Sequence, residues 1–445
     1  MNIFKMHKRL LFLLLTAAAF DAADAQVWSL QQCLDTAQVH NKSLKVGRNQ
    51  IASSGHKTKE AKALLLPRVT ANAEYRYYAA LPYQLLPLST FSPTAPDGQF
   101  KEAQFGVPHN LNASLQLNMP LYNPQAYGAI QTAQIASELN ELQYRKTAEQ
   151  VFFEISNLYY NAQILHHQLA FSDSNVLNSE RLLNNTKLMH EQLLARATDV
   201  SRLNLQVSQL RVQKEKINNQ YEQVLNALKF AMGISLEQRF QIDPNIIRAG
   251  IPEYTSNVSS DLRIEETRKR MLSSELTTLS RSRYLPALNL FGTYGTNGFG
   301  YDKQPDPFLK FFPLGFAGIQ LSYPLFNGTQ TTHKMAQKQL EIQNSELQIE
   351  ILTEQNAMQL ENALKQRLLS ERAIETASEQ IEVAQTIYAQ TLLQQKQGIA
   401  NLSDVLLTDN ALRTAQQNYL SSVIDYLKAD LELKKISGNI NVNKP

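Results

Sequence analysis

The fold of this chain is decided by a stretch that occurs twice, as LQLNMPLYN at residues 115–123 and as IQLSYPLFN at residues 319–327. Both copies carry Gln, Leu, Pro-Leu, an aromatic residue and Asn at the same positions, and their prolines lie 204 residues apart. Each copy alternates as a strand does, ends at its proline and leads directly into a long run of helix-forming residues. An internal repeat of this kind predicts a chain built from two copies of one structural unit.

Two segments in each half alternate with period 2, which predicts strands with one apolar and one polar face. The predicted strands are 68–78, 111–120, 287–295 and 316–324. One interpretation is a pair of hairpins half-buried on a soluble core. Aromatic residues near the strand ends and charges on the opposite face favour another, with lipid outside and water inside. The residues predicted to face the lumen are Thr70, Asn72, Glu74, Gln116, Asn118, Asn289 and Gln320.

Long proline-free segments follow the second strand of each half. A helix of seventy residues would be roughly 100 Å long, which exceeds a globular helix and indicates a coiled coil. The predicted first repeat, 26–233, holds a helix at about 29–63, a long helix at 125–194 and a helix at 198–231. The predicted second repeat, 260–437, holds helices at 260–283, 329–396 and 403–435. Prolines and glycines predict a loop at 81–110, a connector at 234–259 and a flexible tail at 438–445.

The N-terminus has the composition of a secretory signal peptide at residues 1–25. A basic head precedes an apolar run at 10–20 and the small-residue site Ala-Asp-Ala at 23–25. Later residues contain no apolar window of 18 residues, so membrane-spanning helices are not expected. The single cysteine, Cys33, excludes a disulfide within the chain and is expected to be an ordinary helix residue rather than a lipid anchor.

Composition and motifs give no indication of enzymatic chemistry. The chain has 43 Lys and Arg against 40 Asp and Glu, a near balance that does not favour nucleic-acid binding. The sequence contains no phosphate-binding glycine loop, no HExxH pair and no G-x-S-x-G nucleophile. We therefore expect no cofactor, no metal and no catalytic residue.

Four strands per chain are too few to close a sheet in a membrane, because open edges leave main-chain groups without partners. The predicted fold is therefore mostly α-helical with a small membrane β-barrel that several copies complete together. Closure alone allows two, three or four copies.

The chain resembles the outer membrane factor family of TolC-like channels over essentially its whole mature length. The resemblance rests on WSLQQCLDTA at 28–37, on the doubled strand stretch, and on two helix restarts that read LLARATDV at 193–200 and GIANLSDVL at 398–406. It implies a homotrimer in the outer membrane, with twelve strands in one barrel and a coiled-coil α-barrel that crosses the periplasm. It also implies a periplasmic adaptor and an inner-membrane pump as partners, which would dock at the restarts.

The resemblance places the candidate site at these two restarts. An acidic selectivity ring would involve Asp404 and Asp199, together with Thr198 and Ser403. The residues that would face a docking partner are Leu193, Leu194, Gly398, Ile399 and Leu402. Acids in the first turn also stabilise a helix through its dipole, so a structural role for both aspartates comes first. Leu407 stands where relatives can carry a second acid, and Leu193 replaces the glycine that opens the other turn.

The predicted function is that of a passive conduit, the outer-membrane channel of a tripartite efflux system. Two alternatives remain at this point. One is the exit duct of a type I protein secretion system, which would have the same channel body. The other, from a different class, is a structural coiled-coil envelope protein that conducts nothing.

Overall fold

The computed structural model describes residues 27–88, 94, 96, 98–246, 258–301 and 309–438. The predicted signal peptide, residues 247–257 of the predicted connector and most of the predicted tail lie outside the described residues. The chain divides into two compact units. The first comprises Met1–Ile51, Asn140–Glu266 and Leu347–Pro445, and the second comprises Ala52–Leu139 and Thr267–Glu346.

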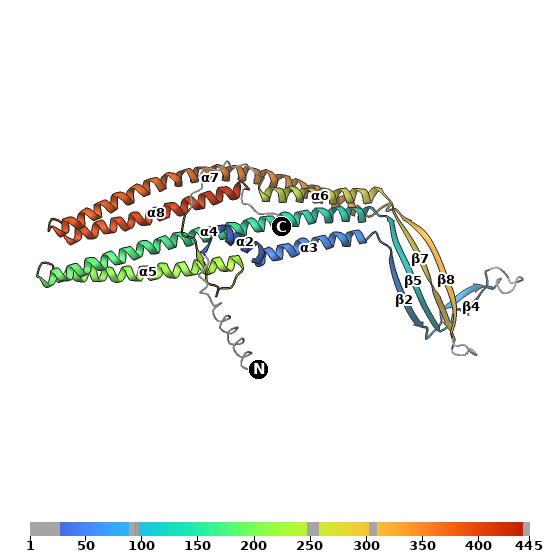
Figure 1. The fold of residues 1–445 in the computed structure, drawn as a ribbon. Helices are drawn as coiled ribbons and strands as arrows, with labels where there is room; N and C mark the ends of the chain where they lie inside the picture. The colour runs from blue at the N-terminus through green and yellow to red at the C-terminus, as the bar shows by residue number, and fades with distance from the viewer. Residues whose placement is uncertain are drawn as a thin grey trace, which may run out of the picture. The chain divides into compact units, whose positions relative to one another are not determined.

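Long helices make up most of the chain (Figure 1). Four helices contribute residues to both units, namely α3 (Lys42–Ala63), α4 (Pro124–Glu191), α6 (Ser260–Tyr284) and α7 (Gln330–Lys396). The first unit also holds β1 (Val27–Trp28), α2 (Leu30–His40), α5 (Ala197–Met232), β6 (Gln241–Ile242) and α8 (Leu402–Ile436). No helix in the described part of the chain has an apolar stretch of the length that crossing a membrane requires.

The helix expected at 29–63 is divided into α2 and α3 at Asn41. The backbone of Asn41 is extended, with φ −58° and ψ 129°, so the helix cannot continue through it. Its side chain accepts a hydrogen bond from the Leu44 amide over 3.0 Å and donates one to the Ala231 carbonyl over 2.6 Å. The break therefore provides polar groups that tie the N-terminal helices to α5.

The main core of the first unit lies where α2, α3, α4 and α5 meet. Leu44, Ile155, Leu228 and Met232 are all fully buried there. Burial raises the pKa of the Cys33 thiol to about 12, so this residue is an unreactive core member. The segment before α2 is held by a parallel pairing of β1 with β6.

The second unit contains a four-stranded antiparallel sheet in the order β2-β5-β7-β8 (Figure 1). Its strands are β2 (Arg68–Tyr77), β5 (His109–Tyr122), β7 (Ala287–Gly300) and β8 (Leu309–Ser322). The central pair, β5 with β7, joins the strands of the two sequence repeats into one sheet. Strand β8 begins seven residues before the alternation predicts. Its first half is apolar on both faces apart from Lys310, so it shows no alternation.

The prediction of a loop at 81–110 is wrong in one respect. This segment contains an additional hairpin, β3 (Tyr83–Pro87) paired antiparallel with β4 (Phe100–Gln104). The alternation of β3 is short and ends at Pro87, whose missing N–H is tolerated at a strand end. Prolines in the segment therefore mark the ends of a short pairing as well as turns.

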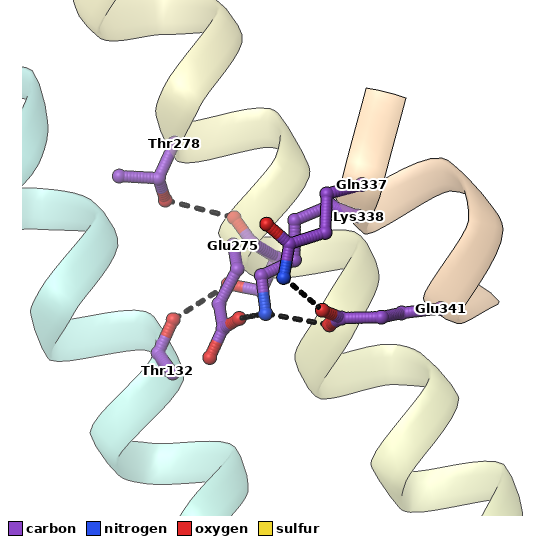
Figure 2. A network of polar contacts seen from close by, with 7 residues as sticks. Thr132, Glu275, Thr278, Gln337, Lys338 and Glu341 are labelled. Carbon is purple, nitrogen blue, oxygen red and sulfur yellow. Dashed lines mark hydrogen bonds and ion pairs between the residues drawn. The ribbon is translucent and has the colours of Figure 1, made fainter. Parts of the chain in front are cut away.

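A polar network joins the helices of the second unit (Figure 2). The Lys338 ammonium on α7 lies 2.8 Å from Glu275 on α6 and 2.7 Å from Glu341 on its own helix. The hydrogen bonds that the Lys338 ammonium donates to the two carboxylates raise the pKa of Lys338 above its usual value. Helices α4 and α6 approach closely beside this network, because a Cβ atom on Gly128 would lie 2.0 Å from the Thr278 hydroxyl oxygen.

Candidate functional site

The two helix turns of the first unit close in the same way. Leu193 in the α4–α5 turn has φ 62°, and Gly398 in the α7–α8 turn has φ 73°. In both turns the next amide donates to the carbonyl five residues earlier, over 2.8 Å from Leu194 and 2.9 Å from Ile399. This is the closure of a helix by a left-handed residue, a position that ordinarily favours glycine. The two repeats thus share one turn geometry with different residues at its strained position.

The helices that follow these turns begin differently. Helix α5 has Arg196 at its N-cap and no side-chain capping bond, so Thr198 lies inside the first turn and does not cap the helix. Helix α8 has Asn401 at its N-cap. The Asn401 side chain accepts from the Asp404 amide, and the Asp404 carboxylate accepts from the Asn401 amide, each over 3.0 Å. Ser403 is therefore a first-turn residue, and Asn401 is the cap that the sequence analysis missed.

The two predicted acids both lie in the first turn of a helix. Asp404 is exposed and Asp199 is half-buried. The reciprocal bonds of Asp404 with the helix start show a structural role for its carboxylate. The Arg202 guanidinium donates to the Ser403 hydroxyl over 3.3 Å, so the starts of α5 and α8 are in contact.

Most of the predicted docking residues are apolar and open to solvent in the single chain. Leu193 is 90% exposed, Leu194 70% and Ile399 72%. Leu402 differs, because it packs on the apolar cluster between the helix pairs. Exposed leucines at the outer ends of helices form a surface suited to a protein partner.

An apolar cluster joins the two helix pairs just behind the turns. Leu203 of α5 and Val405 of α8 are fully buried in it. Tyr388 of α7 and Leu182 of α4 complete the contact among all four helices. The ends of the two repeats therefore pack on each other within one chain.

Next to this apolar cluster on α8 lies a buried carboxylate, that of Asp409, which is only 4% exposed. The Gln206 amide of α5 donates to the Asp409 carboxylate over 2.9 Å, and the Arg413 guanidinium lies 2.9 Å from the same oxygen. Burial raises the pKa of Asp409, while Arg413 and Gln206 act in the opposite direction. Burial also raises the pKa of Tyr388 to about 12, with a further contribution from the Asp409 charge.

Sequence reasoning did not identify this cluster. The only signal is the spacing of four residues from Asp409 to Arg413, which is also the spacing of an ordinary surface ion pair. Gln206 carries no signal at all, because it meets Asp409 only through the packing of α5 on α8. We name Gln206, Asp409 and Arg413 the polar latch.

The sheet of the second unit has a polar and an apolar face. Its register pairs Thr70 with Gln116, and Asn289 with Gln320. Residues directly opposite each other in an antiparallel sheet share a face. The register therefore brings the seven residues predicted to face a lumen onto one face. The other face is mainly apolar and includes Val69, Ala71, Tyr75, Leu115, Leu117, Leu288, Leu290, Ile319 and Leu321.

Within the described residues, no cluster of three or more His, Cys, Asp or Glu side chains is placed to hold a metal ion. The structure thus has three candidate functional features: the exposed surface of the helix turns, the polar latch and the two-faced sheet.

Comparisons with known proteins agree in sequence and in fold. The family model described as "Outer membrane efflux protein" matches residues 33–234 and 266–439. The alkaline protease secretion protein AprF of Pseudomonas aeruginosa is 21% identical over 398 residues, covering 85% of this chain and 77% of that protein. The outer membrane protein TolC of Salmonella enteritidis is 20% identical over 429 residues, covering 94% of this chain and 83% of that protein.

Among solved structures, the outer membrane protein VceC of Vibrio cholerae superimposes with a TM-score of 0.74. The match covers 92% of this chain and 96% of VceC at 15% identity, which shows a common fold. The family model matches most of both repeats, and the members of this family are channels rather than enzymes. This chain therefore belongs to the outer membrane efflux protein family and is an outer-membrane channel protein.

Proposed function

We propose that the chain is the outer-membrane component of a tripartite efflux system, acting as a passive trimeric conduit that is gated at its helix turns. The observation that carries this proposal is the two-faced sheet, in which Thr70, Gln116, Asn289 and Gln320 share a face opposite an apolar one. Three copies would join their sheets into a twelve-stranded barrel with the polar face inside. Lipid would then contact only the apolar face.

Two features support association of identical chains. Strands β2 and β8 end the sheet, and each has a pairing partner on one side only in the described part of the chain. Helix α7 carries Leu347, Ile351 and Met358, which are 56%, 55% and 55% exposed in the single chain. Spacings of four and seven residues are those of a coiled-coil seam, so another helix is expected to cover them. The trimer, rather than a dimer or tetramer, follows from the family resemblance.

The helix turns are the proposed gate and also the proposed docking surface for a partner protein. Exposed apolar side chains at Leu193, Leu194 and Ile399 suit a periplasmic adaptor, which would couple the channel to an inner-membrane pump. The polar latch joins α5 of one repeat to α8 of the other. Opening would separate these helices, as a two-state rearrangement that the docked partner favours. Asp404 and Asp199 would then stand near the entrance.

The experiment is conductance of the full chain in planar bilayers. Replacing Gln206 by Ala removes a charge-assisted hydrogen bond worth about 1.5–3 kcal/mol, so the open fraction should rise by roughly one order of magnitude or more. Gln209→Ala is the matched control, because Gln209 lies on the same helix and is exposed. Absence of potassium chloride current from both variants would overturn the conduit and favour a non-conducting coiled-coil spacer.

The similarity to AprF supports a second candidate, the exit duct of a type I protein secretion system. The two candidates differ in cargo rather than in channel body. Deleting the gene for this chain should increase the susceptibility of its host to toxic small molecules if the chain serves efflux. Unchanged susceptibility with loss of one secreted polypeptide from the medium would favour secretion.

A further inference from the structure

The polar face of the sheet carries one apolar region, on its last two strands. Phe316 pairs with Thr293 and Phe312 pairs with Asn297 in the β7–β8 register, so both phenylalanines share a face with these polar residues. Three more side chains belong to the same region by the same alternation. We name as the apolar stripe the residues Phe291, Phe299, Phe312, Leu314 and Phe316.

Two contacts place the stripe on the proposed lumen face. The Asn112 amide on β5 donates to the Asn297 amide oxygen on β7 over 2.7 Å, which fixes both side chains on one side of the sheet. Asn118, a predicted lumen residue, is directly opposite Phe291. The stripe therefore adjoins amide side chains and lies opposite the mainly apolar face.

The side chains of the apolar stripe pack on one another but stay accessible to solvent. Phe291 lies 6.3 Å from Phe316 between ring centroids, and Phe299 lies 6.0 Å from Phe312. Phe291 also covers Gly318, since a Cβ atom there would lie 2.8 Å from the ring. In the single chain Phe312 remains 52% exposed and Phe316 51% exposed. Ring pairing thus holds the side chains in place without covering them.

Neither lipid nor a neighbouring copy accounts for this surface. Lipid would contact the opposite face, where Tyr294 and Ile319 point. A neighbouring strand would extend the sheet beyond the edge of β8 through main-chain bonds, so its side chains would flank the stripe rather than cover it. Within a conduit, a solute that passes along the lumen can reach this surface.

We propose that the apolar stripe is a transient binding surface for solutes with an aromatic or hydrocarbon body as they pass through the channel. The proposal rests on the proposed function, because the stripe faces a lumen only in a closed conduit. Aromatic pairs gain energy beyond simple burial, so ring-bearing solutes should be retained longest. Lys310, opposite Phe299 in the register, adds a positive charge at one end of the stripe and should favour anions among them.

The test uses the full chain carrying Gln206→Ala in planar bilayers, with sodium chloride current as the baseline, because tetraphenylborate precipitates with potassium and stays dissolved with sodium. Three ions are added in turn to measure block, namely tetraphenylborate, tetraphenylphosphonium and tetraethylammonium. The first two share four phenyl rings and differ in charge, and the third has no ring. We expect both ring-bearing ions to block at lower concentration than tetraethylammonium.

Replacing Phe312 and Phe316 together by Ser should raise the half-blocking concentration of both ring-bearing ions about tenfold. Replacing both by Tyr keeps the rings and should leave the block unchanged. Phe311→Ser is the matched control, because Phe311 is the neighbouring residue on the opposite face and pairs with Gly298. Sodium chloride current in each variant shows that it has folded and inserted.

Three results would overturn the stripe alone while the conduit stands. They are equal block by all three ions, unchanged block in the double Ser variant, and equal weakening of block in Phe311→Ser. Absence of sodium chloride current from the Gln206→Ala chain would overturn the conduit, and the stripe with it.

Discussion

Leu193 and Gly398 occupy the same left-handed position in the two helix turns, with φ values of 62° and 73°. Only one of them is a glycine, so the first turn stores backbone strain that the second does not. A leucine at positive φ costs roughly 1 kcal/mol relative to glycine. Leu193 is 90% exposed, so packing does not repay this cost in the single chain.

Replacing Leu193 by Gly should therefore stabilise the α4–α5 turn by about 1 kcal/mol. Hydrogen exchange of the turn amides should slow roughly fivefold, since 1 kcal/mol is about that factor. Gly398→Ala is the reciprocal change, and nothing lies within 4 Å of a Cβ atom built on Gly398. It should speed exchange in the α7–α8 turn through strain alone. Faster exchange in the Leu193→Gly turn would contradict the strain.

Replacing Asp404 by Asn tests the proposed selectivity role separately from the capping role. An asparagine oxygen can still accept the Asn401 amide bond, so the start of α8 should remain intact. Removing the charge should lower the cation preference of the channel, read as a reversal potential closer to zero in a potassium chloride gradient. Asp425→Asn is the control, because Asp425 is an exposed acid on the same helix that lies 21 residues beyond Asp404. An unchanged reversal potential in Asp404→Asn would leave Asp404 with its capping role only.

The buried Asp409 should make stability depend on pH. The pKa of Asp409 in the folded state is raised above the ordinary 3.8. Between pH 3.8 and this raised pKa, the folded state binds more protons than the unfolded state. The contribution of Asp409 to stability is therefore fully present below pH 3.8 and is lost as pH rises through the raised folded pKa. Asp409→Asn cannot titrate, so its thermal midpoint should fall less over this range. Parallel midpoint curves for the two proteins would rule out Asp409 as the source.

Lys338 holds α6 against α7 through Glu275 and Glu341 (Figure 2). Lys338→Gln should weaken this contact by no more than about 1 kcal/mol, because partly exposed ion pairs contribute little. Hydrogen exchange at residues 267–284 and 330–346 should quicken, and added salt should reduce the difference. The matched control is Lys334→Gln, an exposed lysine one turn earlier on α7. Equal effects of the two changes would show that the carboxylate pairing does not matter.

Local patterns in the sequence were enough to predict the long helices and the four strands of the sheet. The helices follow from long stretches without proline, and the strands from alternating polar and apolar residues. The start of β8 was missed, since residues 309–316 are apolar on both faces apart from Lys310 and show no period. The break at Asn41 was missed because its stabilising partner, the Ala231 carbonyl, lies 190 residues away.

The candidate site was predictable only in part. Helix starts and the glycine at Gly398 are local signals, so the turns could be placed from sequence. The polar latch could not, because the contact of Gln206 with Asp409 joins residues 203 apart and exists only once α5 packs on α8. The apolar stripe likewise needed the register, which decides that Phe312 and Asn297 share a face.

Strands β2 and β8 each leave one edge without a pairing partner in the described part of the chain. A hydrocarbon interior holds no water to replace the missing bonds, so a chain entering a bilayer alone would carry two rows of unsatisfied main-chain groups. Insertion and association should then occur as one step. The rate of insertion into vesicles is accordingly expected to depend on chain concentration with an order above one, and the lag before insertion should shorten as more chains are added.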